Sequence, residues 1–182
     1  RFLKEAGMDA IKLEGGVRVA SRIKAISDAG IVVIGHIGLT PQSSGVLGGF
    51  KAQGRTAKSA EEVIKDAIAV EEAGAKILLV EAIPPELACA ITKIVKIPVL
   101  GIGAGADIDG QVMICGDILG YFEAFTPKFV KKYANIAKIA VDAIKEYVKD
   151  VKSSKFPAQE HTYSVLPEEK DNFNNMLKKY LK

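Results

Sequence analysis

Five short apolar runs recur along the chain, and each has the length of a β-strand. The clearest are residues 31–34 (Ile-Val-Val-Ile) and residues 77–80 (Ile-Leu-Leu-Val). Continuous runs of this kind are typical of strands buried on both faces of a parallel sheet. The same reasoning, applied to less regular runs, predicts strands at residues 10–13, 98–102 and 112–115.

Amphipathic stretches separate these runs and repeat apolar side chains at the spacing of a helix. One of them opens with a proline pair, which suits the first turn of a helix. The predicted helices span residues 17–29, 57–73, 84–95, 128–151 and 171–181. Alternation of strands and helices predicts an α/β fold with a parallel sheet and right-handed crossovers.

Polar residues stand at the ends of three predicted strands. Glu14 ends the first strand, His36 follows the second, and Glu81 follows the third. The fourth strand opens into the glycine loop 103–105. Functional groups at the C-terminal ends of several strands are the arrangement of a (β/α)8 barrel. The glycine-rich loop that begins at residue 35 and ends at 55 contains apolar residues, which indicate that it is ordered and packed.

Each polar candidate also has a purely structural interpretation. Glu81 suits a general base, because an apolar strand end disfavours a charged carboxylate, but a strand-end glutamate can also simply face water. His36 could contact a ligand or be a hydrogen-bonded core histidine. Lys12 and Glu14 alternate along one strand and so share a face. They form either an ion pair without a ligand or part of a site for an anion.

Composition restricts the class of function. The 182 residues are 48% apolar and 26% charged, the balance of a globular domain, with a net charge of only +3. Nucleic-acid binding is therefore unsupported, and no apolar run is long enough to span a membrane. Cys89 and Cys115 lack metal-type spacing, so we expect reduced core cysteines in a cytoplasmic protein. The first residues resemble the end of a helix, so we expect the chain to be part of a longer protein.

Several of these stretches together resemble the ketopantoate hydroxymethyltransferase family. They follow the order and spacing of the family, and the resemblance extends to about residue 160. The residues that carry it are IKLEGG (11–16), GHIGLTPQS (35–43), GGFKAQGR (48–55), LLVEAIPPELA (78–88) and IPVLGIGAG (97–105).

The resemblance implies a (β/α)8 TIM-barrel fold. About five of its eight βα units would lie in residues 1–152, and residues 153–182 would form a C-terminal tail. The implied reaction transfers a hydroxymethyl group from 5,10-methylenetetrahydrofolate to 3-methyl-2-oxobutanoate, forming ketopantoate on the route to pantothenate and coenzyme A. Mg²⁺ would be the cofactor, and the partners would be a small 2-oxo acid and a folate. The family suggests a homo-oligomer, a decamer.

The resemblance also implies roles for the four candidates. Glu81 matches the catalytic base, Lys12 and His36 match residues that contact the keto acid, and Glu14 matches a magnesium ligand. Two further metal-binding aspartates would come from strands upstream of Arg1. Two alternatives stay open: another magnesium-dependent lyase of 2-oxo acids on a related barrel, and a non-catalytic remnant without a complete site. Turnover that depends on methylenetetrahydrofolate would distinguish the hydroxymethyltransferase from such a lyase. Metal titration would test whether the chain is a non-catalytic remnant.

Overall fold

A computed structural model describes residues 1–181, and the chain divides into two compact units, residues 1–134 and 135–182. The first unit holds the sheet and the predicted site. The sequence analysis placed the division after residue 152 instead. The whole of helix α7 (Ile136–Lys152) belongs to the second unit, and none of its residues is buried.

The core of the first unit is a sheet of five parallel strands, which are hydrogen-bonded in the order of the chain. The strands are β1 (Ala10–Glu14), β2 (Val32–Gly38), β3 (Ile77–Glu81), β4 (Val99–Ile102) and β5 (Gly110–Gln111). Helices connect the first four strands. This confirms the predicted α/β class, and the sequential order of parallel strands is that of neighbouring strands in a barrel.

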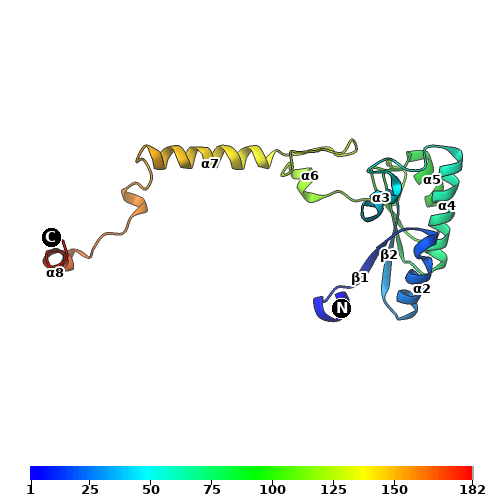
Figure 1. Cartoon of the computed structure of the whole chain (residues 1–182), viewed down its shortest axis with the longest axis horizontal. Coiled ribbons are helices and arrows are strands. Elements are labelled where there is room, and N and C mark those ends of the chain that lie inside the picture. Colours follow the sequence, from blue (N-terminus) through cyan, green and yellow to red (C-terminus); the bar gives the residue numbers. More distant parts are fainter. Residues whose placement is uncertain (182) are drawn as a thin grey trace. The chain divides into compact units, whose positions relative to one another are not determined.

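Helices cover one face of this sheet (Figure 1). They are the short turn η1 (Val17–Val19) with α2 (Ala20–Asp28), then α4 (Ala57–Glu72) and α5 (Pro85–Ile94). The start of α4 is fixed by a capping box, in which the side chains of Thr56 and Ser59 satisfy each other's backbone N–H groups. Buried strand residues such as Val33, Leu78 and Val80 pack against the apolar sides of these helices. The three predicted helices are thereby confirmed.

The remaining helices of the chain are short, apart from α7. The predicted helix at 128–151 begins only at Ile136, where the Asn135 side chain accepts a hydrogen bond from the Lys138 N–H. Among residues 1–181, no helix is both long and apolar enough to cross a membrane. The other short elements are α1 (Phe2–Ala6), η2 (Pro41–Ser43), α3 (Ser44–Leu47), α6 (Cys115–Leu119), η3 (Gln159–His161), η4 (Pro167–Glu169) and α8 (Lys170–Leu177).

Two strand predictions are wrong in their bounds. β2 continues through the glycine and histidine to Gly38, so His36 lies inside the strand and not after it. Pairing with a neighbour on each side holds His36 there, opposite Glu14 on β1 and Leu79 on β3. The fifth strand comes before residues 112–115, because the pairing with β4 ends there and the chain turns into α6.

The cysteine prediction is only partly correct. Cys89 and Cys115 both carry free thiols. Cys89 is half-buried on α5, whereas Cys115 is exposed at the start of α6 and is not a core residue. The sequence analysis placed Cys115 at the end of a buried strand, and that strand lies elsewhere.

Gly35 lies where β2 packs tightly against α4, and its replacement is expected to destabilise the protein. A Cβ atom there would lie 2.1 Å from Cγ1 of the buried Val70. We expect Gly35→Ala to lower the free energy of unfolding by about 1–3 kcal/mol, the usual cost of overpacking a core. Urea denaturation of the full-length protein measures it. Gly45→Ala is the matched control, because a Cβ at Gly45 meets no atom within 4 Å; equal stability of the two variants would contradict this packing.

Candidate functional site

The strand register gathers the four predicted site residues on one face of the sheet. Glu14 is paired with His36 across β1 and β2, and Glu81 ends the adjacent strand β3, opposite Gly38. Paired residues of parallel strands point to the same side, so Glu14 and His36 share the face that the helices leave free. Lys12, two positions before Glu14, places its Nζ 3.6 Å from Glu14 Oε1. The predicted shared face of Lys12 and Glu14 is thereby confirmed.

His36 lies between two carboxylates. Its Nδ1 is 3.5 Å from Glu14 Oε1 and its Nε2 is 3.1 Å from Glu81 Oε2, while the imidazole is only 1% exposed. Although the second distance is short, neither contact is a hydrogen bond, so both nitrogens lack a hydrogen-bond partner among residues 1–181. Buried polar groups without partners are rare and costly. The imidazole is therefore a candidate to interact with a bound molecule.

The two carboxylates are held differently. Glu14 is 11% exposed, and its Oε2 accepts a hydrogen bond of 2.9 Å from the backbone N–H of Gln42. This bond ties the loop after β2 to the end of β1 and leaves Oε1 facing Lys12 and His36. Glu81 is 14% exposed, and its one close polar side-chain contact in the described chain is His36. Of the two carboxylates, that of Glu81 is held by fewer contacts.

The backbone beside Glu81 is tightly constrained. Gly38 has a φ of +84°, and a Cβ atom there would lie 2.4 Å from the Glu81 carbonyl oxygen. The same oxygen accepts the Leu39 N–H at 2.9 Å. Ala82, the next residue, has a φ of +49°, which is unusual for a residue other than glycine. Strained backbone of this kind is often found at functional sites, and here it adjoins the proposed base.

Burial raises the pKa of the Asp66 carboxyl group on α4. Desolvation is the main cause, and the hydrogen bond that Oδ1 accepts from the Val17 N–H, 2.8 Å long, partly opposes it. This group closes the turn after β1, and a Cβ atom at Gly16 would lie 1.8 Å from its Oδ1. Its partners are structural, so we assign it to the fold and not to the site.

The described residues fit a metal ion only in part. Carboxylate oxygens are the ligands that Mg²⁺ prefers, and Glu14 offers one oxygen, Oε1, that accepts no hydrogen bond from a backbone group. However, residues 1–181 contain no group of three or more His, Cys, Asp or Glu arranged to hold an ion. The described residues therefore offer Glu14 as a candidate ligand but no set of three ligands.

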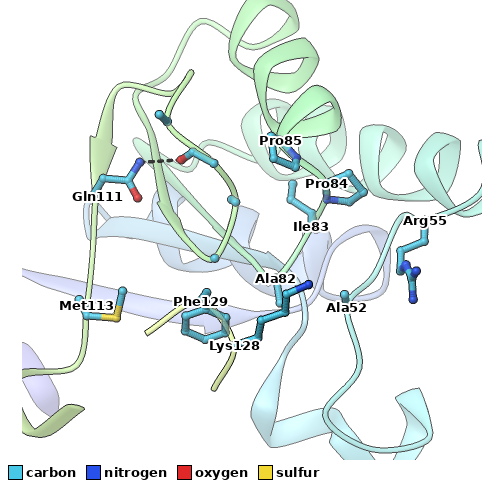
Figure 2. A pocket seen from close by; sticks show the side chains of 14 residues that line it. Ala52, Arg55, Ala82, Ile83, Pro84, Pro85, Gln111, Met113, Lys128 and Phe129 are labelled. Carbon is cyan, nitrogen blue, oxygen red and sulfur yellow. Dashed lines mark hydrogen bonds between the residues drawn. The ribbon is translucent and has the colours of Figure 1, made fainter. Parts of the chain in front are cut away.

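A pocket of about 850 Å³ lies at the C-terminal ends of β3 and β4 (Figure 2). Ala82 and Ile83, which directly follow Glu81, line it, as do all residues of the predicted glycine loop 103–105. Sequence reasoning missed Lys128 and Phe129 at this pocket, because it placed them at the start of a surface helix. The glycine loop was the one local signal that pointed here.

These features define a class: an α/β protein whose parallel strands follow a barrel-like order and present acid–base groups at their C-terminal ends. The sequence profile of the ketopantoate hydroxymethyltransferase family matches residues 1–159, and the chain belongs to this family.

Relatives with a shared name support the assignment. The 3-methyl-2-oxobutanoate hydroxymethyltransferase of Alkaliphilus metalliredigens is 61% identical over 91% of this chain and 58% of its own length. The protein of that name from Bacillus pumilus is 48% identical over 98% of this chain and 64% of its own. The chain thus spans about three fifths of these relatives. A solved phosphonopyruvate hydrolase aligns with 97% of the chain and 62% of its own, at 16% identity and a TM-score of 0.44, too weak a likeness to bear on function.

Proposed function

We propose that the full-length protein transfers a hydroxymethyl group from 5,10-methylenetetrahydrofolate to 3-methyl-2-oxobutanoate and so forms ketopantoate. The observation that carries this proposal is the buried His36 imidazole, which lies between Glu14 and Glu81 without a hydrogen-bond partner in the described chain. Membership in the family and the names of the relatives support it. Formation of ketopantoate that requires both the folate and the keto acid is the test.

Glu81 is the proposed general base. Its carboxylate removes the proton from the carbon next to the keto group of 3-methyl-2-oxobutanoate, which leaves an enolate. The enolate carbon forms a bond to the methylene carbon of the folate, and the bonds from that carbon to the folate nitrogens break. Water supplies the hydroxyl oxygen, and the folate nitrogens leave with protons. The Glu81 side chain is 14% exposed, so the surrounding protein shields the base from bulk water and still leaves it accessible to a substrate.

Lys12 and His36 are the proposed contacts to the keto acid. The Lys12 side chain is 46% exposed, and Glu14 is its one ion-pair partner in the described chain, so it can turn towards a substrate carboxylate. His36 is fixed by burial and can donate a hydrogen bond to the substrate when the keto acid is bound. Their difference in exposure supports a role in charge neutralisation for the lysine and in orientation for the imidazole.

Glu14 is the proposed protein ligand for Mg²⁺ in this part of the chain. Its backbone partner, the Gln42 N–H, orients the carboxylate through Oε2 and leaves Oε1 for a ligand role. When bound, the ion would act as a Lewis acid that stabilises negative charge on the keto oxygen of the substrate. A site with one or two protein carboxylates, completed by water and substrate oxygens, is common for this ion.

Lys12→Met is expected to raise the KM for the keto acid, with a smaller change in kcat. A charge-assisted contact to the substrate carboxylate already exists before the transition state, so its loss weakens ground-state binding. Steady-state kinetics at saturating folate measures both constants. Lys76→Met is the control, because Lys76 is exposed just before the opposite end of β3. An unchanged KM in Lys12→Met would show that the lysine does not contact the keto acid and serves only in its ion pair with Glu14.

A further inference from the structure

The pocket beyond Glu81 is large, and the proposed roles of the four clustered residues do not use it. Its volume of about 850 Å³ is in the range of sites for drug-sized ligands and exceeds what a small 2-oxo acid needs. Ala82 and Ile83, the two residues that follow Glu81 in the chain, form part of its wall. The pocket is thus placed to hold the second reactant of a two-substrate reaction.

Its walls are largely apolar and include an aromatic ring. Ile83, Pro85, Met113 and Phe129 contribute apolar surface (Figure 2). The Phe129 ring packs so closely on Gly103 that a Cβ atom there would lie 2.5 Å from Cδ1. An aromatic ring held by its own packing offers a fixed surface on which a flat ring system can stack.

The pocket is also held open by hydrogen bonds within the first unit. Gln111 Nε2 donates to the Gly105 carbonyl oxygen at 2.7 Å, a bond drawn in Figure 2. On the opposite wall, the Gln53 N–H donates to the Ala82 carbonyl oxygen at 2.9 Å and fixes the segment that leads to Arg55. Binding of a ligand therefore costs little conformational entropy for ordering the pocket.

The charge of the pocket is positive. Arg55 and Lys128 are its two charged lining residues, and both are cations. Neither forms an ion pair with a carboxylate of residues 1–181. In Figure 2 their side chains extend on either side of Ala52. Two cations without partners beside an apolar cavity favour a ligand with a flat apolar ring and more than one negative charge.

We propose that this pocket binds the folate donor, with Arg55 and Lys128 contacting the carboxylates of its glutamate tail and Phe129 stacking on its ring system. This assignment rests on the proposed function, because the donor is the one reactant of that reaction with such a shape and charge. The donor would then enter the reaction from the side of Ala82 and Ile83, the residues that follow Glu81.

The test measures folate binding to the full-length protein and its Arg55→Met and Lys128→Met variants. Each variant is expected to raise the Kd for tetrahydrofolate roughly tenfold or more, because one charge-assisted contact is lost. For tetrahydropteroate, which lacks the glutamate, each variant should bind as the unaltered protein does. Arg22→Met and Lys93→Met are matched controls, since both residues are exposed on helices away from the pocket.

Two outcomes would overturn the assignment. Unchanged tetrahydrofolate binding in both variants would show that neither cation contacts the ligand. Equal losses of affinity for tetrahydrofolate and tetrahydropteroate would show that the cations do not contact the glutamate tail. Hydrogen exchange at the third carbon of the keto acid, measured without folate, keeps the two proposals apart. If the unaltered protein catalyses exchange but the variants bind folate normally, the pocket assignment alone fails. If it catalyses neither exchange nor turnover, the proposed function fails.

Discussion

Glu81→Gln is expected to slow hydrogen exchange at the third carbon of 3-methyl-2-oxobutanoate by roughly a hundred- to ten-thousand-fold, the usual contribution of a general base. Glutamine preserves the size of the side chain and its contact distance to His36 but cannot take the proton. Binding of the keto acid should therefore persist while exchange is lost. Deuterium wash-in followed by NMR measures the exchange rate directly, without the folate.

The control for this experiment is Glu62→Gln, which removes an exposed carboxylate on α4, a helix on the covered face of the sheet. It should leave the exchange rate unchanged. Near-normal exchange in Glu81→Gln would remove the carboxylate from the role of base and would leave it a partner of His36 only.

Glu14→Gln is expected to raise the Mg²⁺ concentration that half-saturates exchange by at least tenfold. An amide oxygen is a weaker ligand for a hard cation than a carboxylate oxygen, while it can still accept the Gln42 N–H and so preserve the loop. Even residues that only orient metal ligands usually contribute roughly 10–100-fold to metal affinity. Titration of Mg²⁺ during the exchange assay measures the shift.

Circular dichroism and the KM for the keto acid check that this variant keeps its fold and substrate site. If Glu14→Gln needs no more Mg²⁺ than the unaltered protein, Glu14 is no metal ligand. Its carboxylate would then serve to hold Lys12 and the Gln42 loop.

The sequence predicted those parts of the fold that depend on local pattern. The apolar run before Glu81 predicts a strand, and the alternation of Lys12 with Glu14 puts both side chains on one face. The structure has both as predicted. By contrast, the place of His36 depends on the register between β1, β2 and β3, a long-range property. Because of Gly35, the predicted strand ended too early. The local sequence also could not show that the imidazole lies between two carboxylates.

The pocket was beyond prediction for a related reason. Phe129 and Lys128 lie far along the chain from Glu81, and their helical spacing with later residues resembled an amphipathic surface helix. The helix instead starts at Ile136, and Phe129 packs on Gly103. Periodicity alone cannot separate a helix from an irregular segment that packs on a glycine loop.

Transfer of a ¹³C label tests the central claim most directly. The full-length protein is supplied with 3-methyl-2-oxobutanoate and 5,10-methylenetetrahydrofolate labelled at the methylene carbon, and the product is followed by NMR. We expect the label to appear in the hydroxymethyl carbon of ketopantoate, with one labelled carbon for each tetrahydrofolate released. Absence of labelled product, or cleavage of a carbon–carbon bond in the 2-oxo acid without folate, would contradict the proposed reaction.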